Sequence, residues 1–432
     1  MRIAIIGSGI SGVVAGLKLH RDHEITVFEA NDYIGGHTHT VDVSFADRDY
    51  AIDTGFIVFN DRTYPNFQRL LHEHRVAYQP SPMSFSVKND RNGWEYCGSN
   101  LNGLFAQRKN LFNPRFVGMI RDILRFNQQA TGALQESEQT VGEYLKKHRY
   151  GHAFGESYFL AMGAAIWSCP QDQFAEFPIR FIAKFFDNHG LLSITNRPQW
   201  YVISGGSREY LKKFTAHFQD RIQLNSPVRQ IRRLAESVEV TVKDRAPEQF
   251  DHVIFACHSD QALRMLDEPT ALETEVLSCF PYEKNSAVLH TDETLLPKKR
   301  TAWAAWNYHV RRDQPRASTV TYNMNILQGI ESRRTFCVTL NEDDLIDPGQ
   351  ILGQYNYAHP LFTLEREAAQ SRHRDLIDHD RISYCGAYWG NGFHEDGVNS
   401  ALAVTQVLNA SNYEAGATCT AGSTKAGSGI GA

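Results

Sequence analysis

The sequence predicts an α/β fold in which a domain built on a parallel sheet is interleaved with a second, α+β domain. Three observations predict this arrangement. The first 40 residues combine an apolar strand, a glycine-rich turn and a helix. Glycine turns beside apolar strands return after residue 200 and again after residue 380. The segments between these returns have helical and then alternating periodicity, which is typical of a separate domain.

The amino-terminal stretch carries the spacing G-x-G-x-x-G directly after a strand. Residues 3–6 form an apolar, β-branched run typical of a buried parallel strand, and they lead into Gly7, Gly9 and Gly12. The first glycine permits the tight turn, the second lets the backbone approach a pyrophosphate, and the third lets the helix pack on the sheet. The helix expected over residues 10–20, beginning with Ile10 and Ser11, would direct its N–H groups at the phosphates.

A second strand, expected over residues 25–28, ends at Glu29, which lies 22 residues after Gly7. In Rossmann-type units an acid at this distance binds the ribose hydroxyls, and Ala30 beside it belongs to the same predicted site. The glycine spacing alone is a weak signal. Strand, helix and acid together predict a dinucleotide site.

A Gly-Gly pair, Gly35 and Gly36, then indicates FAD rather than NAD. This order resembles the two-dinucleotide-binding flavoproteins, in which such a pair carries the chain past the pyrophosphate a second time. His37 stands where the amine-oxidase branch usually has arginine, and His37 and Thr38 complete the expected contacts. Farther on, Thr54 and Gly55 belong to a D-T-G phrase that resembles the Asp-x-Gly found near the flavin; the alternative is a plain Asx turn.

Two later stretches are expected to return to the cofactor. The resemblance implies that the backbone of Val228 holds the adenine; the alternative is a purely structural valine. Residues 381–404 read as a strand that ends at Gly386, a glycine-rich turn and a helix. The resemblance implies that the amino end of this helix, with Val398, faces the flavin. Cys385 lies in the strand, before the turn, so FAD is expected to be bound non-covalently.

The same turn supplies the predicted catalytic residues, His394 and Glu395. Their expected roles are a proton relay for His394 and its orienting partner for Glu395. The alternative is that Glu395 and Asp396 only cap the final helix.

These patterns divide the chain into two discontinuous domains and a tail. Residues 1–60, 196–265 and 371–410 are assigned to the FAD-binding domain, and residues 61–195 and 266–370 to the substrate domain. The first substrate segment reads as mostly helical and aromatic, and the second as a sheet with one buried face. The composition of residues 411–432 predicts a disordered tail.

Composition excludes several classes of protein. With 432 residues and a net charge of −5, the chain is long enough for two lobes and is not expected to bind nucleic acid. Its 18 histidines lack the convergent spacing of metal ligands, so no metal is predicted. The seven cysteines have no C-x-x-C pairing, and no leader or membrane-spanning run is seen, so we expect a cytoplasmic protein.

One segment, residues 108–126, is basic and amphipathic. Five Lys and Arg residues accompany one acid, Asp122, and the apolar side includes Phe112, Phe116, Val117, Met119, Ile120 and Leu124. This pattern is typical of a helix that lies on a membrane surface, so a peripheral location at the inner face of the membrane is one expectation. The alternative is an ordinary helix packed on the core.

Several phrases are more specific than the glycines. They include I-W-S-C-P (166–170), R-P-Q-W (197–200) and C-G-A-Y-W-G-N-G-F-H-E-D-G (385–397). Together they make residues 1–408 similar to flavin amine-oxidase-like FAD/NAD(P)-binding proteins related to the N-terminal flavoprotein region of plant cyclopropane fatty acid synthases. The resemblance implies FAD, a Rossmann-type FAD-binding domain, an acyl-lipid substrate and a cyclopropane-synthase-like methyltransferase partner.

The expected activity is that of an FAD-dependent oxidoreductase taking hydride from a C–H bond of an apolar substrate, such as an unsaturated, methylated or cyclopropane acyl lipid. Amine oxidases of this superfamily usually place a lysine on the strand expected here over residues 286–292. That strand contains no lysine; Lys284 lies just before it, and His290 is its one titratable base. Two alternatives stay open: a flavin amine oxidase, and a non-catalytic flavoprotein partner of a lipid-modifying methyltransferase.

Overall fold

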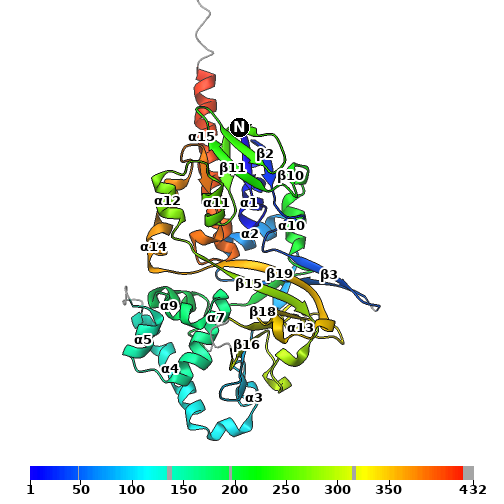
Figure 1. Ribbon diagram of the computed structural model, residues 1–432, viewed down its shortest axis with the longest axis vertical. Coiled ribbons are helices and arrows are strands. Elements are labelled where there is room, and N and C mark those ends of the chain that lie inside the picture. Colours follow the sequence, from blue (N-terminus) through cyan, green and yellow to red (C-terminus); the bar gives the residue numbers. More distant parts are fainter. Residues whose placement is uncertain (47, 134–138, 194–196, 314–317, 422–432) are drawn as a thin grey trace, which may run out of the picture. The chain divides into compact units, whose positions relative to one another are not determined.

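The computed structural model describes residues 1–46, 48–133, 139–193, 197–313 and 318–421 (Figure 1). The chain forms two compact units: the first contains residues 1–36, 211–278 and the chain from residue 369 on, and the second contains residues 37–210 and 279–368. The α/β fold and the interleaved order agree with the sequence prediction. The boundaries differ, because residues 37–60 and 197–210 belong to the second unit, and residues 266–278 and 369–370 belong to the first.

Strand pairing explains the shifted boundaries. β5 (Val58–Asn60) and β6 (Tyr78–Ser81) both pair antiparallel with β9 (Trp200–Ile203). In addition, β3 (Thr40–Ser44) pairs with β4 (Asp49–Asp53). The two ladders on β9 join segments far apart in the sequence, and local patterns do not reveal such long-range pairing.

The first unit is built on a parallel sheet with strand order β10-β2-β1-β14-β20. Its strands are β1 (Arg2–Ile6), β2 (Glu24–Phe28), β10 (Ile222–Gln223), β14 (His252–Phe255) and β20 (Ile382–Tyr384). Central β1 is buried from Ile3 to Ile6, as its continuous apolar run predicts. Ligands of such sheets bind where the strands end.

Helices and a small antiparallel sheet complete the first unit. They are α1 (Ile10–Leu19), α11 (Ser259–Met265), α12 (Ala271–Leu277), α15 (His394–Ala421) and the sheet β11 (Val228–Arg233), β12 (Val238–Val242) and β13 (Glu248–Phe250). α15 runs to Ala421 and so extends past residue 411, where the sequence predicts the tail to begin. Extending an existing helix does not repeat the cost of nucleation. The remaining tail lies outside the described residues.

A seven-stranded sheet organises the second unit, in the order β19-β15-β18-β17-β16-β7-β8. The strands are β7 (Phe85–Asn89), β8 (Trp94–Cys97), β15 (Tyr282–His290), β16 (Trp306–Val310), β17 (Val320–Asn323), β18 (Cys337–Leu340) and β19 (Ile351–Pro360). The sheet predicted after residue 266 is therefore present. Residues 61–195 are mostly helical, as predicted, and they also contribute the short strands β6, β7 and β8. Gly93, with φ +71°, turns the β7–β8 hairpin.

The helices of the second unit are mainly those of its first segment. They are α2 (Pro65–Glu73), α3 (Leu101–Leu104), α4 (Pro114–Ala133), α5 (Val141–Lys147), α6 (His152–Phe154), α7 (Leu160–Trp167), α8 (Gln171–Ala175) and α9 (Ile179–Asn188), with α13 (Met324–Leu327) from its second segment. The boundaries between the units lie within α10 (Arg208–Thr215), within α14 (Leu364–Ser371), after residue 36 and after residue 278. Among the described residues, no helix has the length and apolar content needed to cross a membrane.

Candidate functional site

The glycine turn after β1 has the geometry of a phosphate cradle. Gly7 adopts φ +107°, and a side chain there would press on the backbone of Ala256. Gly12 lies so close to the Gly7 carbonyl that a Cβ would collide with it. At Gly9, by contrast, a Cβ would meet nothing within 4 Å, and this residue gives α1 no side-chain cap. The turn therefore leaves open space beside uncapped helix N–H groups, where a pyrophosphate fits.

Glu29 is held rigidly at the end of β2. Its Oε2 accepts hydrogen bonds from the backbone N–H of Ser8 at 2.9 Å and from the Ser8 hydroxyl at 2.6 Å. Its Oε1 accepts from the backbone and side-chain nitrogens of Asn31 at 2.9 and 3.0 Å. The Ser8 hydroxyl also accepts from the Gly35 N–H at 3.2 Å. Ser8 and Asn31 thus position the predicted ribose acid, a role that the motif spacing did not reveal.

Other predicted cofactor residues of the first unit lie around the same turn. A Cβ at Gly36 would meet the Gly9 Cα at 3.3 Å, so the Gly-Gly pair passes close to the phosphate turn. The amino end of α15 packs on that of α1, because a Cβ at Gly397 would press on Ile10 and Ser11. Val398 is fully buried next to this contact. The structure thus gathers the two glycine motifs and two helix amino ends, and this arrangement fits a dinucleotide.

Val228 and Gly386 are the next two predicted cofactor residues of the first unit. Val228 begins β11, where the pairing with β12 shifts register between Val228 and Gln230. Such a bulge frees backbone groups from the ladder. Gly386 follows β20, and its N–H donates to the Ser400 hydroxyl of α15 at 2.9 Å. Contact of either residue with the cofactor stays a prediction.

His394 and Glu395 form the first turn of α15, and both are buried. Burial lowers the pKa of His394 to about 3, so its imidazole is neutral near pH 7. A neutral imidazole can donate and accept hydrogen bonds, but it is a weak base. The capping role belongs to Asp396, whose carboxylate accepts from the Phe393 N–H at 2.9 Å. The catalytic assignment of the pair stays a prediction.

The remaining predicted cofactor residues, His37, Thr38, Thr54 and Gly55, belong to the second unit. Their two segments continue the β3–β4 ladder: the Thr54 N–H donates to the His39 carbonyl at 2.9 Å, and the Phe56 N–H to the His37 carbonyl at 2.7 Å. A Cβ at Gly55 would collide with the His37 carbonyl, so this position requires glycine. The Thr38 hydroxyl lies 2.6 Å from the Tyr210 hydroxyl.

Asp53, just before Thr54, accepts hydrogen bonds from several separate segments and is therefore more than a simple turn residue. Its carboxylate accepts from the Ser207 N–H at 2.8 Å, the Ser207 hydroxyl at 3.0 Å and the Thr40 hydroxyl at 2.5 Å. The side-chain amide of Gln328 donates to it at 3.2 Å. Complete burial raises the pKa of Asp53 to about 6, against the opposing effect of these donors. Asp53 therefore ties the D-T-G turn to the Gly205–Ser207 turn.

Sequence reasoning missed a cluster on β19. Tyr355, Tyr357 and His359 alternate along this strand and so share one face. The Tyr357 hydroxyl lies 2.7 Å from the Thr54 hydroxyl and 3.1 Å from His39 Nδ1. The His37 ring lies 5.2 Å from the ring of Tyr357 and 5.4 Å from that of His359. The period-two spacing of Y-N-Y-A-H was the available signal.

The two faces of the seven-stranded sheet differ in chemistry. One, here called the aromatic face, carries residues that are direct register partners: Trp306, Tyr308, Val320, Tyr322, Val338, Leu340, Ala287 and Leu289. The opposite, polar face carries Thr321, Thr339 and His290, and the Thr339 hydroxyl lies 2.7 Å from His290 Nε2 and 2.8 Å from the Thr321 hydroxyl. Since side chains alternate, His290 cannot reach the aromatic face.

The structure corrects the reading of β15. The strand begins at Tyr282, so Lys284 lies inside it and not before it. Lys284 is nevertheless exposed and an even number of residues from His290, which places both on the polar face. Burial lowers the pKa of His290 to about 4, and its Nδ1 accepts the Asp292 N–H at 3.1 Å. Neither Lys284 nor His290 therefore faces the aromatic side.

The aromatic face is covered in part by α7 and α8. The side-chain amide of Gln171 donates to the Tyr308 hydroxyl at 3.3 Å, and the Ser318 hydroxyl donates to the Ala164 carbonyl at 2.9 Å. Trp306 remains half-buried, with its ring edge-on to Tyr322 at 5.0 Å. Its buried indole N–H has no hydrogen-bond partner among the described residues. A ligand oxygen could accept this hydrogen bond.

Cys385 supports a testable statement about cofactor attachment. It is fully buried just after β20, and burial raises the pKa of its thiol well above the usual value. A protonated, enclosed thiol is a poor nucleophile, so we expect no covalent flavin bond. After acid precipitation, the yellow colour should leave with the supernatant for the wild type and for Cys385→Ser. Colour retained in the washed pellet of the wild type, and lost in Cys385→Ser, would contradict this.

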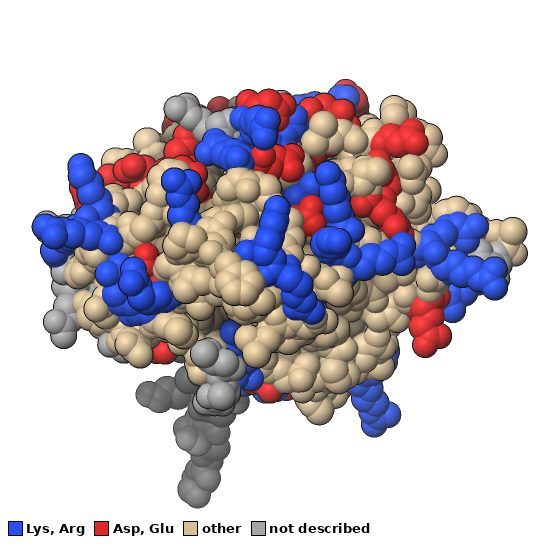
Figure 2. Space-filling view, turned by 90° about the horizontal axis from the view of Figure 1, so that it is seen from below, with Lys and Arg blue, Asp and Glu red and all other residues tan. Residues whose placement is uncertain are grey.

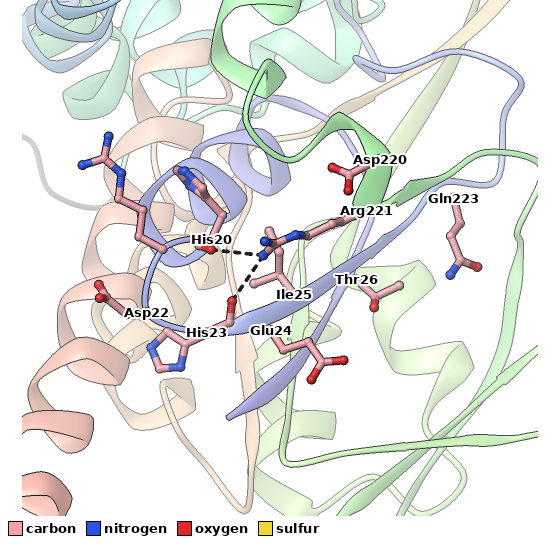
Figure 3. A pocket seen from close by; sticks show the side chains of 10 residues that line it. His20, Asp22, His23, Glu24, Ile25, Thr26, Asp220, Arg221 and Gln223 are labelled. Carbon is pink, nitrogen blue, oxygen red and sulfur yellow. Dashed lines mark hydrogen bonds between the residues drawn. The ribbon is translucent and has the colours of Figure 1, made fainter.

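A polar hollow of about 560 Å³ lies elsewhere on the first unit (Figure 3). Arg221 lies in it and donates to the backbone carbonyls of His20 and His23 at 3.0 and 3.4 Å, so its charge serves the fold. Glu24, which begins β2, also lines it. The hollow is thus at the amino end of the strand, whereas the glycine turn follows the carboxyl end of β1. Its volume suits a small ligand, but its position excludes it as the dinucleotide site.

Comparison with known proteins points to one family. A family model described as flavin containing amine oxidoreductase matches residues 10–301. The 1-hydroxycarotenoid 3,4-desaturase of Flavobacterium sp. (strain P99-3) is 26% identical over 157 residues, which are 36% of this chain and 28% of that protein. Flavin-containing amine oxidase A of Bos taurus is 22% identical over 268 residues, 59% of this chain and 49% of that protein. The chain thus spans half or less of the length of these two relatives.

Solved structures share the fold over nearly the whole chain. A CLA-producing fatty acid isomerase from P. acnes matches with a TM-score of 0.66 at 15% identity, covering 94% of this chain and 98% of that one. Cyclohexylamine oxidase from Brevibacterium oxydans IH-35A matches with a TM-score of 0.66 at 15% identity, covering 94% and 99%. At this identity the likeness concerns the fold alone.

Proposed function

Because the chain belongs to the flavin-containing amine oxidoreductase family, its dinucleotide is FAD, and we propose that it is an FAD-dependent oxidoreductase acting on a C–H bond of an apolar substrate. The substrate class we propose is an acyl lipid with an unsaturated, methylated or cyclopropane chain. FAD, when bound, supplies the hydride acceptor. The residues of this chain must then bind the substrate, exclude water and hold its oxygen atoms.

One observation carries the choice of an apolar substrate: the aromatic face of the seven-stranded sheet. Its central strands β16, β17 and β18 contribute aromatic and aliphatic side chains to that face and no carboxylate, ammonium or imidazole. Trp306 and its register partner Phe85 are both half-buried, which leaves apolar surface accessible. An acyl chain gains free energy by covering such a surface, whereas an ammonium would lose its hydration without a paired charge.

The unpaired indole N–H of Trp306 adds a polar anchor to this face. We propose that it donates to the carbonyl or carboxylate oxygen of the acyl substrate. A buried N–H left without a partner is unfavourable, so the bond would strengthen binding and orient the chain. Trp306→Phe keeps the ring and removes the donor. We expect it to raise the substrate Kd about tenfold, in line with loss of one buried hydrogen bond.

Amine oxidation is the second candidate, and two observations favour it. The family model and the bovine relative are both described as amine-oxidising. In addition, Glu283 of β15 shares the aromatic face, because it alternates in step with Ala287, and it could pair with an ammonium. Proteins with this fold act on both kinds of substrate, since its neighbours include a fatty acid isomerase and an amine oxidase.

The deciding experiment is anaerobic mixing of the holoprotein with acyl lipids and with amines, followed by loss of the visible flavin absorbance. We expect acyl chains to bleach the flavin and amines to leave it oxidised, with Glu283→Gln reduced at the wild-type rate. Bleaching by an amine that Glu283→Gln prevents would replace the proposal by amine oxidation. No bleaching by either class, with co-purification of a methyltransferase, would favour the non-catalytic partner role.

The same mixing experiment tests His394 and Glu395. Their burial in the first turn of α15 supports a role in orienting groups near the cofactor, and the neutral His394 would act as a hydrogen-bond partner. Flavin reduction in His394→Ala and Glu395→Gln should be about tenfold slower than in the wild type or more, in line with the loss of one hydrogen bond to the reacting groups. Wild-type rates in both variants, at full flavin content, would remove the assignment.

A peripheral location at the membrane also belongs to this proposal.

A further inference from the structure

An exposed apolar surface lies where η1 (Arg108–Phe112) meets α4. Phe112 is 90% exposed and Leu101 is 74% exposed, and Leu111, Val117 and Leu124 are each nearly half exposed. We call these five residues, with the exposed cations Arg108, Lys109, Arg115 and Arg121, the basic apolar patch. Five of the eight large apolar residues that the described structure exposes lie in this 24-residue stretch. Exposed apolar side chains gathered in this way mark an interaction surface.

The structure divides the apolar residues of this segment between two environments. Phe116 and Met119 are buried in the core of the second unit, so they are unavailable to a partner. Val117, Arg121 and Leu124 are spaced at i, i+4 and i+7 and share the outer side of α4. The sequence assigned both sets to one apolar side. In fact α4 has an inner stripe that packs in the core and an outer stripe that is exposed to solvent.

Phe112 is presented by a fixed turn. Asn110, in the same turn, is buried and donates to Gln107 Oε1 at 3.1 Å, and that oxygen also accepts from the Glu95 N–H at 3.2 Å. Asn113 then accepts from the Arg115 N–H at 3.0 Å and so caps α4. The aromatic ring therefore stays outside because its backbone is anchored on both sides. Such preorganisation lowers the entropic cost of inserting it into a partner.

The charges of the patch have one sign. The only acid between residues 101 and 125 is Asp122, which is buried and accepts from the Gly151 N–H at 2.9 Å. Arg125 is turned inward: it lies 3.3 Å from Asp122 and its guanidinium stacks on Tyr150 at 4.1 Å. Figure 2, a view of this end of the second unit, shows Lys and Arg spread over a mostly uncharged face. A partner must therefore be apolar and anionic.

We propose that the basic apolar patch docks on the surface of an anionic lipid bilayer. Phe112, Leu111 and Leu101 would enter the headgroup boundary, and Arg115, Arg121, Arg108 and Lys109 would contact the anionic headgroups. The separate apolar side chains among like charges suit a fluid lipid surface better than a rigid protein partner, which needs a continuous apolar core. The inference deepens the proposed function, because docking brings the protein to a source of acyl substrate.

Vesicle flotation tests the docking without any turnover, so it can fail or succeed independently of the proposed chemistry. Purified holoprotein is mixed at low salt with phosphatidylcholine vesicles that contain or lack phosphatidylglycerol. We expect the wild type to float only with phosphatidylglycerol, and added salt to release it. Phe112→Ser should weaken binding about tenfold or more, the effect of removing one buried aromatic contact. Arg115→Glu with Arg121→Glu should abolish flotation.

Matched controls replace residues of the same kind outside the patch. Leu345→Ser removes an exposed leucine of the second unit, and Lys243→Glu with Arg264→Glu makes the same change in net charge at exposed positions of the first. These variants should float like the wild type. Flavin content and thermal midpoint verify that each variant is folded. Three results overturn the proposal: no flotation of the wild type, equal flotation of Phe112→Ser, or a wild-type dimer that Phe112→Ser dissociates and that does not float.

Discussion

Replacing Gly9 with valine is expected to yield a folded, colourless protein. The backbone at Gly9 has φ −63° and ψ 178°, which any residue can adopt, and a Cβ there meets nothing within 4 Å. The fold therefore tolerates the change. The same open space is what the pyrophosphate needs, and the added side chain would fill it in front of the α1 N–H groups. Flavin content should fall to about one tenth of the wild type or less.

Two measurements distinguish lost cofactor binding from lost folding. Added FAD should raise the thermal midpoint of the wild-type apoprotein and leave that of Gly9→Val unchanged, because only a bound ligand stabilises the native state. Gly98→Val is the matched control: its site is exposed, and a Cβ there also meets nothing within 4 Å. It should keep full flavin content. A yellow Gly9→Val with a normal response to FAD would show that the pyrophosphate lies elsewhere.

Replacing Asp53 with alanine is expected to destabilise the second unit by about 3–5 kcal/mol, the range for breaking a buried, hydrogen-bonded charge. The change leaves the Ser207 N–H, two hydroxyls and the Gln328 amide facing a void. Asp49→Ala, at the exposed start of the same strand β4, should change the free energy of unfolding by less than about 0.5 kcal/mol. Similar losses in the two variants would contradict the role of Asp53.

Tryptophan fluorescence during urea unfolding isolates this effect, because five of the six tryptophans, all except Trp389, belong to the second unit. The pH dependence gives an additional test. Burial raises the pKa of Asp53 from 3.8 to about 6, so the folded state binds the proton more tightly than the unfolded state. The stabilisation that proton binding at Asp53 gives is fully present below about pH 4 and is lost as the pH rises through 6. The free energy of unfolding then changes by about 3 kcal/mol. Asp53→Asn should lack this component.

Local patterns were sufficient to predict the first unit and its phosphate turn. The run from Ile3 to Ile6 is buried on both sides of a parallel sheet, and Gly7 and Gly12 lie where a Cβ would press on backbone. These features depend on neighbouring residues and on backbone sterics, so the sequence carries them directly. The same spacing predicts Glu29 as the ribose acid. Its fixation by Ser8 and Asn31 does not follow from the spacing, since either residue could equally have faced solvent.

Long-range pairing decided the rest. The sequence revealed that His290 is a titratable base on β15, but only the register with β17 and β18 placed it on the face opposite Trp306. A shift of one residue would have exchanged the two faces, because side chains alternate with a period of two. Likewise, residues 108–126 are amphipathic by composition, but the anchored turn at Asn110 determined that Phe112 stays outside while Phe116 fills the core. Residue types set the available chemistry, and tertiary contacts determined which surface each side chain serves.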